Sequence, residues 1–108
     1  MSIDARIVKK VVSKEQSQIR TISDLAQLLG SPPDALRKEF MRRERTSLSR
    51  YVSGVRIERA KKLLLNSNQK CKEICLAIGF SREDIGSRVF KRHTGLSMEE
   101  FRRIGRRQ

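Results

Sequence analysis

The side chains of this chain that could carry chemistry are mostly cations. Of its 108 residues, 25 are lysine or arginine and 12 are aspartate or glutamate, so the formal net charge is +13. The first 54 residues hold 11 cations and 6 anions and the last 54 hold 14 and 6, so the excess is not confined to a tail. So small and basic a protein repels itself unless a polyanion neutralises it. We therefore expect nucleic acid as the first partner and an anionic membrane surface as the second.

The residue types that serve catalysis and metal binding are scarce. Cys71 and Cys75 are the only cysteines and His93 is the only histidine, which gives neither a disulfide framework nor the spacing of a zinc site. No nucleophile, base and orienting acid form a recognisable pattern, and no glycine-rich phosphate loop occurs. The sequence predicts no enzymatic activity, no metal site and no cofactor.

The elements that must position the cations are helices throughout. Strand-like alternation never persists, and the two prolines stand together at Pro32 and Pro33. The sequence therefore predicts an all-α fold, with helices at about 4–20, 24–29, 32–44, 48–66, 71–78, 81–93 and 97–107. Apolar runs such as Leu63–Leu65 are far too short to span a membrane, and no signal-peptide core is present, so we expect a cytoplasmic protein.

Local signals mark the ends of several of these helices. Thr21 with Asp24, and Ser97 with Glu100, have the spacing of a capping box, although Ser23 is an alternative cap for the second helix. We expect Gly30 to end that helix in a left-handed conformation. In the first helix, one apolar face is predicted from Ile3, Ile7, Val8, Val11 and Val12.

The two halves of the chain repeat one pattern. Leu25-Ala26-x-x-Leu29-Gly30, followed by Leu36 and Phe40, is echoed by Ile74-Cys75-x-x-Ile78-Gly79, followed by Ile85 and Phe90. Each copy predicts a short helix, a tight glycine turn and a second helix, which is the helix-turn-helix plan. The second copy has one extra residue between the glycine and the phenylalanine.

From about Thr21 to Arg103 the sequence resembles the DNA-binding domain of the AraC/XylS family of bacterial transcription regulators. The resemblance rests on three motifs in the family's order and spacing. They are Arg56-x-x-Arg59-Ala60-Lys61-x-Leu63-Leu64, Glu73-Ile74-Cys75-x-x-Ile78-Gly79-Phe80, and Ser87-Arg88-Val89-Phe90-Lys91-Arg92-x-x-Gly95-x-Ser97 followed by Phe101-Arg102.

The resemblance implies about seven helices in two helix-turn-helix subdomains. Subdomain 1 spans about 4–47 with its helix-turn-helix at 21–44, and subdomain 2 spans about 67–108 with its helix-turn-helix at 71–93. A linker helix at about 48–66, roughly 28 Å long, joins them. The recognition helices, at about 32–44 and 82–93, would enter adjacent major-groove segments of double-stranded DNA.

The resemblance also implies which side chains meet the DNA. Positions that face bases in the family fall on Asp34, Ala35, Arg37, Lys38, Glu83, Asp84, Ser87 and Arg88. Arg37 and Arg88 are the best candidates for base readout, because a guanidinium group can donate to guanine O6 and N7. Phosphate contacts are expected from exposed cations and from helix N-termini, at Ser23, Arg42, Arg43, Ser47, Arg50, Lys91, Arg92 and Ser97. The C-terminal arginines 102, 103, 106 and 107 form either a phosphate clamp or a frayed end.

The chain departs from the family pattern at a few positions. Gly86 stands where a large core residue is usual, so we expect a gap in the second recognition helix that Ile85 can fill. Arg45 replaces a glycine and is expected to take a left-handed conformation at roughly 1 kcal/mol of strain. Pro32 replaces the usual cap, so Ser31 is expected to cap instead. Met98 replaces a proline.

Three further points complete the expectations from the resemblance. Cys75 replaces a small core alanine and is interpreted as a buried inert thiol, with a redox switch or metal clip as the alternative. Family members often carry another domain before this module, so the chain is either a small stand-alone protein or a C-terminal piece. The module alone is expected to be a monomer, and a longer protein could dimerise through the missing domain.

The sequence thus predicts sequence-specific binding of double-stranded DNA by part of a bacterial transcription regulator, at the nucleoid and away from membranes. Two rivals stay open. A non-specific architectural DNA-binding protein is favoured by Gly86 and the acidic reader positions. An interaction module would instead contact RNA polymerase or another regulatory partner and use its basic face secondarily.

Overall fold

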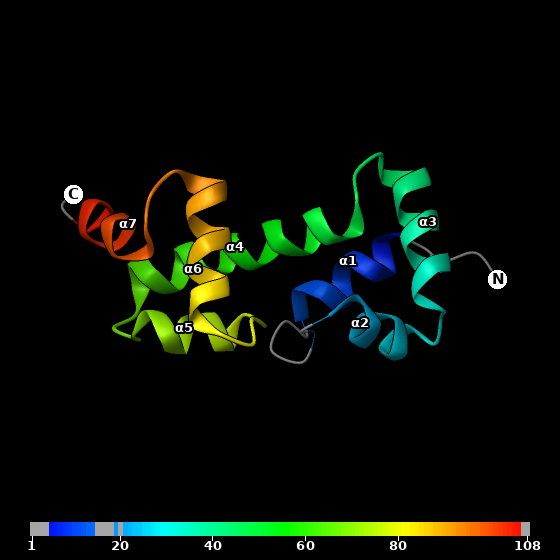
Figure 1. The fold of residues 1–108 in the computed structure, drawn as a ribbon, viewed down its shortest axis with the longest axis horizontal. Coiled ribbons are helices and arrows are strands. Elements are labelled where there is room, and N and C mark those ends of the chain that lie inside the picture. Colours follow the sequence, from blue (N-terminus) through cyan, green and yellow to red (C-terminus); the bar gives the residue numbers. More distant parts are fainter. Residues whose placement is uncertain (1–4, 15–18, 20, 107–108) are drawn as a thin grey trace. The chain divides into compact units, whose positions relative to one another are not determined.

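The computed structural model describes residues 5–14, 19 and 21–106, and within these ranges every regular element is a helix (Figure 1). The helices are α1 (Ala5–Lys14), α2 (Ile22–Leu29), α3 (Pro33–Glu44), α4 (Leu48–Asn66), α5 (Cys71–Ala77), α6 (Glu83–Thr94) and α7 (Met98–Gly105). The predicted all-α class is confirmed. None of the helices described is both long and apolar enough to cross a membrane.

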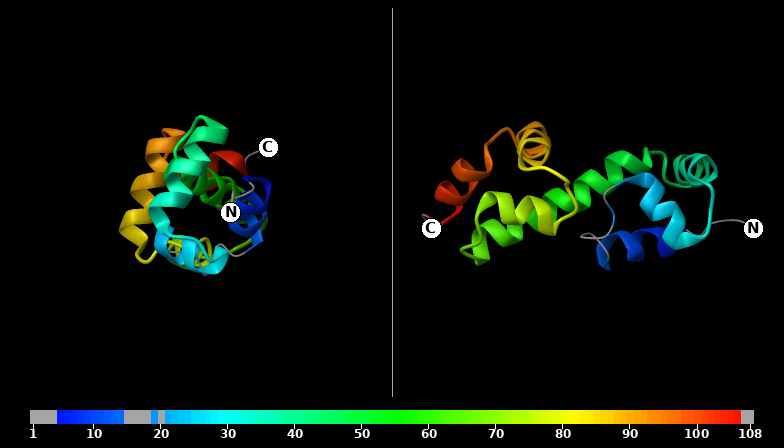
Figure 2. Two further views of the ribbon diagram at one scale, coloured as in Figure 1. Left: turned by 90° about the vertical axis from the view of Figure 1, so that its right-hand side faces the viewer. Right: turned by 60° about the horizontal axis from the view of Figure 1, so that its bottom comes forward.

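The chain forms two compact units that meet within α4, Met1–Val55 and Arg56–Gln108. In each unit a short helix, a tight turn and a second helix follow one another, as α2–α3 and as α5–α6 (Figures 1 and 2). Each unit has its own apolar core, to which α4 contributes. The first core contains Val8, Val12, Ile19, Leu25, Ala26, Leu36, Phe40, Leu48 and Val52. The second contains Ile57, Ala60, Leu64, Ile74, Cys75, Ile78, Phe80, Phe90 and Met98.

The internal repeat extends beyond the helix-turn-helix segments that the sequence predicts. Residues 8–12 of α1 read Val-Lys-Lys-Val-Val and residues 60–64 of α4 read Ala-Lys-Lys-Leu-Leu, with the same order of buried, half-buried and exposed side chains. Downstream, Phe40 packs on Tyr51 with ring centroids 5.4 Å apart, and Phe90 packs on Phe101 at 5.5 Å. Each unit is therefore a helix, a helix-turn-helix and a further helical segment that closes the core.

The predicted caps are confirmed where they depend on local sequence. Thr21 Oγ1 accepts from the Asp24 amide and Asp24 Oδ2 accepts from the Thr21 amide, both at 3.1 Å, so Thr21 rather than Ser23 caps α2. Gly30 is left-handed at φ 66°. Arg45 is left-handed as well, at φ 60°, and is the only non-glycine with positive φ in the described ranges.

The expected cap at Ser31 is wrong. Pro32 occupies the N-cap position of α3 and no side chain caps the helix. The Ser31 hydroxyl instead donates to the Pro32 carbonyl oxygen over 3.5 Å. Pro33 follows at the first helical position, where its missing N–H has no intrahelical partner to lose, so the proline pair starts the helix without a capping side chain.

The first helix is shorter than predicted. α1 ends at Lys14, and Ile19 is buried outside any helix, while Ile3 and Arg20 lie outside the described residues. Val8 and Val12 are buried as expected, but the side chain of Ile7 is 54% exposed, so the predicted apolar face is narrower. Lys9 Nζ lies 2.6 Å from Glu44 Oε1, which ties α1 to the end of α3.

The expected gap at Gly86 is also wrong. Gly86 is buried, and a Cβ atom placed on it would lie 2.6 Å from Cys75 Sγ and 3.1 Å from the Phe80 ring. Cys75 and Phe80 thus fill the space that a large residue on α6 would take, and Ile85 does not repack into it but is 38% exposed. Met98, which replaces the usual proline, is buried with its Sδ 3.7 Å from Cys75 Sγ.

Arg102 and Arg106 do not form a frayed end, and the phosphate clamp stays a prediction. Arg102 donates to the carbonyl oxygens of Leu64, Ser67 and Gln69 over 3.0, 3.2 and 2.7 Å, so it binds the last turn of α4 and the segment after it. Arg106 donates to Asn68 Oδ1 and the Ser67 carbonyl. Arg103 is exposed and Arg107 lies outside the described residues.

The packing at Gly86 predicts that Gly86→Ala destabilises the protein by about 1–3 kcal/mol, because the added methyl group overpacks the site. Alanine is the better helix former, so propensity alone would give stabilisation by about 1 kcal/mol. Gly54→Ala is the matched control, since Gly54 lies inside α4 with no atom near an added Cβ, and it should stabilise. The measurement is the free energy of unfolding from urea titrations followed by circular dichroism.

A double substitution tests whether the new methyl group acts through overpacking. In a Cys75→Ala background, the space left by the sulfur should accept the Gly86→Ala methyl group, so the cost of that change should fall by about 1 kcal/mol or more. Equal costs in both backgrounds would contradict the packing described above.

The hydrogen bonds of Arg102 predict that Arg102→Ala lowers the free energy of unfolding by about 2 kcal/mol, because three carbonyl groups lose a charged donor. Arg102→Lys should recover only part of this loss, since one ammonium group cannot span the three acceptors. Arg88→Ala is the control, because Arg88 is exposed on α6, and it should change stability little. If Arg102→Ala and Arg88→Ala were equally stable, the structural role of Arg102 would be refuted.

Candidate nucleic-acid interface

The outward faces of α3 and α6 carry the residues that the sequence nominated. In α3, Leu36 and Phe40 are buried, and in α6 the buried residues are Gly86 and Phe90. The other residues of each helix lie on its sides or on its outward face, as the helical period of 3.6 residues requires. Exposed positions on α3 are Asp34, Ala35, Arg37, Lys38, Met41, Arg42 and Arg43. On α6 they are Glu83, Asp84, Ile85, Arg88, Lys91, Arg92 and His93.

The two faces match when the helices are aligned on their buried phenylalanines, 50 residues apart. An aspartate, an apolar residue and a cation then follow in the same order, as Asp34, Ala35 and Lys38 on α3 and as Asp84, Ile85 and Arg88 on α6. Arg42 and Arg92 continue the match. At these four positions α3 and α6 present the same order of side-chain types, whereas Arg37 corresponds to Ser87 and Met41 to Lys91.

The acids of these faces pair with neighbouring cations. Asp34 Oδ1 lies 3.3 Å from Arg37 Nη1, and Asp84 Oδ1 lies 3.1 Å from Arg82 Nε. Their side chains stay largely exposed, Asp34 at 88% and Asp84 at 54%, so these ion pairs hold little energy and can open to a ligand. Arg37, a candidate base reader, is thus oriented by Asp34 before any DNA arrives.

Ser87 differs from the other nominated base readers. It is half-buried, and its hydroxyl lies 3.9 Å from Met98 Sδ. On α6, Ser87 lies at the boundary between the buried face and the outward face of the helix. Of the eight nominated readers it is therefore the one whose polar atom faces the protein interior.

Glu39 holds the two α3 arginines nominated for phosphate contact. Its Oε1 lies 2.7 Å from both Arg42 Nη2 and Arg43 Nε, and its Oε2 accepts from Arg42 Nε at 3.3 Å. The two guanidinium groups lower the pKa of Glu39 to about 2, so the carboxylate stays charged through the physiological range. This carboxylate occupies the place where a phosphate would accept the same donors.

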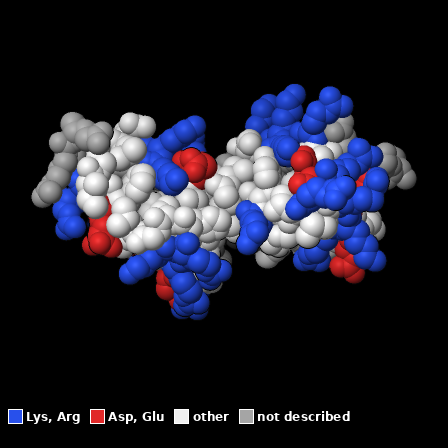
Figure 3. All heavy atoms as spheres, turned by 90° about the horizontal axis from the view of Figure 1, so that it is seen from above, with Lys and Arg blue, Asp and Glu red and all other residues white. Residues whose placement is uncertain are grey.

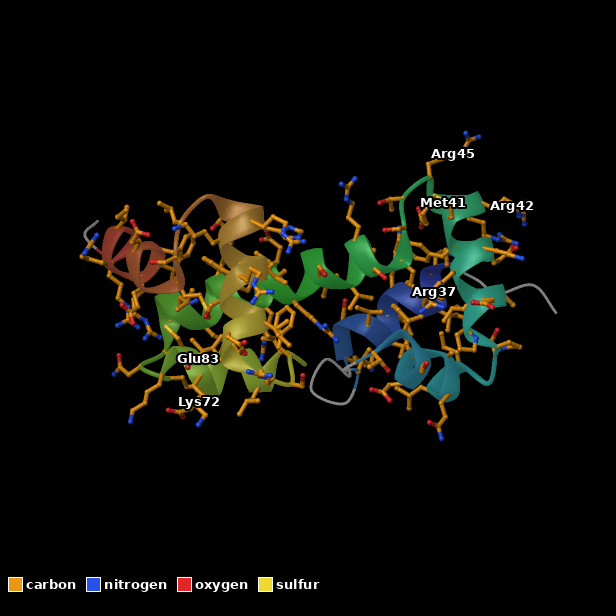
Figure 4. All side chains as sticks on the ribbon, in the orientation of Figure 1. Arg37, Met41, Arg42, Arg45, Lys72 and Glu83 are labelled. Atoms are coloured by element: carbon orange, nitrogen blue, oxygen red, sulfur yellow. The ribbon has the colours of Figure 1, made fainter. Side chains whose placement is uncertain are left out.

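The basic side chains form several groups on the surface of each unit (Figure 3). Acidic side chains lie between them, as the pairing of Glu39 and Asp84 leads one to expect. Toward the C-terminal end of α3, Met41, Arg42 and Arg45 lie near one another, and Arg37 lies closer to the beginning of the helix (Figure 4). The surface of α3 is therefore a mixture of cations, acids and one exposed thioether.

The three helix N-termini nominated for phosphate contact are not equivalent. At α2 and α7 an acid of the capping box lies at the N-terminus: Asp24 accepts from the Thr21 amide and Glu100 from the Ser97 amide, while Ser23 is exposed within the first turn of α2. Backbone and side-chain donation from Ser97 lowers the pKa of Glu100, so its negative charge is secured.

The N-terminus of α4 carries no acid in its first turn. There the Ser47 hydroxyl accepts from the Arg50 amide at 3.1 Å, and Arg50 is exposed. A helix N-terminus favours anions through its unpaired N–H groups and its dipole. Ser47 and Arg50 therefore form the N-terminus that suits a phosphate, whereas Asp24 and Glu100 would repel one.

The cysteines lie away from this surface chemistry. Cys75 is fully buried, as interpreted from the sequence, and burial raises its thiol pKa to about 11. Cys71 is half-buried and its pKa is raised for the same reason. Among the described residues, histidine, cysteine, aspartate and glutamate side chains form no group of three that could hold a metal ion.

Sequence reasoning missed two exposed residues of the interface. Ile85 was assigned to the core, and Arg45 was considered only for its backbone. Counting back from the buried Phe90 instead of forward from Gly79 would have placed Ile85 on the outward face, because Gly86 and not Ile85 is then the counterpart of Leu36. For Arg45, its position at the exposed end of α3 was the available signal.

Comparison with known proteins finds relatives over most of the chain. A family model described as a helix-turn-helix domain matches residues 25–104. The Msm operon regulatory protein of Streptococcus mutans is 30% identical over 96 residues, which are 89% of this chain and 34% of that protein. The chain spans less than half the length of the first curated relatives that it matches, between 34% and 47%.

Solved structures share the fold. The C-terminal domain of AraT, a response regulator from Geobacillus stearothermophilus, superposes with a TM-score of 0.83 at 26% identity, covering 92% of this chain and 83% of that one. The DNA-binding domain of AdpA, a global transcriptional factor solved in complex with a target DNA, gives a TM-score of 0.81 at 19% identity and covers 94% and 91% of the two chains.

The Glu39 cluster predicts that Glu39→Gln strengthens binding to duplex DNA. Removing one unit charge about 6 Å from a phosphate in water should strengthen binding by about three-fold at low salt. Freeing the two arginines should also steepen the salt dependence by about one unit of log K per log salt. Fluorescence anisotropy across a salt series measures both.

The control for this prediction is Glu58→Gln, which removes the same charge from a pair with Lys61 on α4 and should have a smaller effect. Weaker binding by Glu39→Gln would mean that Glu39 positions the arginines for phosphate rather than competing with it.

Proposed function

Because the chain belongs to the helix-turn-helix family of AraC-type transcription regulators, whose domains bind DNA in a sequence-specific manner, we propose that α3 and α6 read bases in two major-groove segments. The base-reading residues in this proposal are Asp34, Ala35, Arg37, Lys38, Glu83, Asp84, Ser87 and Arg88. Lys38 and Arg88 occupy matching outward positions in their own helices, and Arg37 precedes Lys38 on α3. These cations suit guanine O6 and N7, and the two aspartates suit cytosine N4.

The observation that carries the proposal is the matched order of side-chain types on α3 and α6. A surface that attracts DNA through charge alone needs only cations at these positions. Here Asp34 and Asp84 stand at the same place in the two helices, within the first turn that would enter the groove. An acid at that place costs affinity for phosphate, and a base-edge donor such as cytosine N4 would offset that cost. The pattern therefore favours sequence reading over non-specific binding.

Phosphate contacts in the proposal come from the edges of the same surface. Lys91 and Arg92 on α6 are exposed, and Arg42 and Arg43 become available when Glu39 releases them. The acid-free N-terminus at Ser47 with Arg50 adds a backbone site. Ser23 and Ser97, which lie beside capping acids, are the weakest members of the predicted set. Contacts of this kind set the register of the protein on DNA without reading its sequence.

The proposed action is binding without catalysis, by a monomeric module at the bacterial nucleoid. RNA polymerase is the further partner we propose for the regulator. Retention of polymerase by the immobilised chain in the absence of DNA tests that partner. Light scattering in solution tests the monomer.

The proposal predicts the outcome of selecting ligands from a random pool of about 30-base-pair duplexes near physiological salt, where non-specific binding is suppressed. If both helices read DNA, two conserved blocks about 10 base pairs apart should emerge. Arg37→Ala or Lys38→Ala should relax one block, and Arg88→Ala should relax the other, each at a cost of about 1–3 kcal/mol. Sequencing of the enriched pool is the readout.

A single conserved block would show that one helix alone reads sequence. No enrichment, together with binding to all duplexes, would replace the proposal by a non-specific architectural protein. Polymerase retention without any DNA binding would favour the interaction module.

A further inference from the structure

We propose that Ile85 is a specificity-determining residue that contacts the C5 methyl group of a thymine in the segment read by α6. This inference rests on the proposed function and deepens it, because it adds a base reader of a chemical kind that the nominated set lacks on this helix. The nominated readers on α6 are two acids, a serine and an arginine, all of which act by hydrogen bonding.

The packing of the second unit holds Ile85 outside the core. Gly86, the next residue, fills the inward position, and the space beyond it is already taken by Cys75 Sγ and the Phe80 ring. Successive helical residues are rotated by 100°, so Ile85 cannot share that direction. Its side chain is 38% exposed, although Cys75, Ile78, Phe80 and other apolar residues of the unit are almost fully buried. An exposed isoleucine at this place costs hydration free energy that a partner could recover.

Helical spacing places Ile85 beside the proposed hydrogen-bonding readers. Arg88 is three residues further along α6 and Arg92 is seven, so the three form one stripe on the outward face. Asp84 precedes Ile85 and is turned toward Arg82. A base pair next to the one that meets Arg88 would therefore face an apolar surface.

The first unit supplies an internal comparison. Ala35 of α3 stands at the position of Ile85 when the buried phenylalanines are aligned, and both residues are exposed. The positions around them match in type, with Asp34 and Asp84 before them and Lys38 and Arg88 after them. The size of this apolar residue is thus one difference between the two outward faces, beside Arg37 against Ser87 and Met41 against Lys91. We therefore expect α6 to prefer thymine at this position more strongly than α3 does at the matching position.

The chemistry of the major groove identifies the ligand group. Among the four bases only thymine presents a methyl group there, and apolar side chains are its usual contacts. Guanine, adenine and cytosine present polar atoms that a buried isoleucine would leave without a partner. Ile85 is therefore suited to select thymine and to reject the other three bases.

The test compares Ile85→Ala with the unchanged chain in the duplex selection described above. The unchanged chain should enrich one thymine position in the α6 block that Ile85→Ala does not enrich. At that thymine, deoxyuridine removes only the methyl group. It should weaken the unchanged chain about four-fold, the equivalent of about 0.8 kcal/mol for one carbon group, and should leave Ile85→Ala unaffected.

Two controls show whether the effect belongs to Ile85 and to that one methyl group. Ile104→Ala removes an isoleucine that is 48% exposed on α7, outside the proposed interface, and it should keep the thymine preference. Deoxyuridine at the remaining thymines of the duplex should weaken DNA binding by the unchanged chain and by Ile85→Ala equally. Circular dichroism melting curves confirm that both variants are folded.

The outcomes separate this inference from the proposed function. If the unchanged chain and Ile85→Ala enrich the same sequence and lose equal affinity on deoxyuridine substitution, Ile85 reads no methyl group, although sequence-specific binding stands. If the unchanged chain enriches nothing, the proposed function fails and Ile85 has no base to read.

Discussion

Each unit of this protein depends on how the space between the two helices of its helix-turn-helix is filled. In the first unit a small residue on α2, Ala26, and a large one on α3, Leu36, are both fully buried in the same core. In the second unit Cys75 and Phe80 supply the volume and Gly86 leaves room for it. Protein interiors are packed at nearly constant density, so the two solutions bring equivalent helices together with different side chains. The packing also decides which residues of α3 and α6 face solvent, because it fixes which residues of the same helices face inward.

Several cations of this protein pair with nearby acids, although cations outnumber acids in the chain as a whole. Arg37, Arg42 and Arg43 on α3 each lie within an ion pair, and Arg82 at the start of α6 does too. A ligand must offer acceptors as good as the Glu39 carboxylate before Arg42 and Arg43 turn to it, whereas the exposed pairs of Asp34 and Asp84 open more easily. Such competition weakens binding to an arbitrary polyanion more than binding to a duplex that satisfies acids and arginines together. Under the proposed function, these acids would therefore contribute to selectivity as well as lower the net charge.

The parts of the structure that could be predicted from the sequence are those set by neighbouring residues. The capping boxes at Thr21 and Ser97, the left-handed Gly30 and Arg45, and the helical periods all depend on contacts within a few positions. Apart from the Ser31 cap, which the neighbouring Pro32 displaced, the main errors arose where distant segments meet. Arg102 binds carbonyl groups more than thirty residues earlier in the chain, and no local pattern reports that.

The assignment of Ile85 to the core failed for a related reason. The extra residue in the second turn shifts the repeat by one position, and only the space occupied by Cys75 and Phe80 decides which of Ile85 and Gly86 turns inward. The aromatic anchors were easier to predict, because Phe40 and Phe90 are large apolar residues at the same place in both copies, and both are buried. For the interface, residue types could be nominated, but the pairing of arginines with acids within α3 depends on side-chain geometry.

The shared helix α4 has a consequence for how this protein loses its structure. A unit of about 54 residues buries too little surface to be more than marginally stable by itself. The first part of α4 is held by one core and the last part by the other. A helical segment of about ten residues does not persist in water without such packing. When one core melts, its part of α4 unwinds toward the other, so local damage in either half is expected to spread as a cooperative loss of the whole chain.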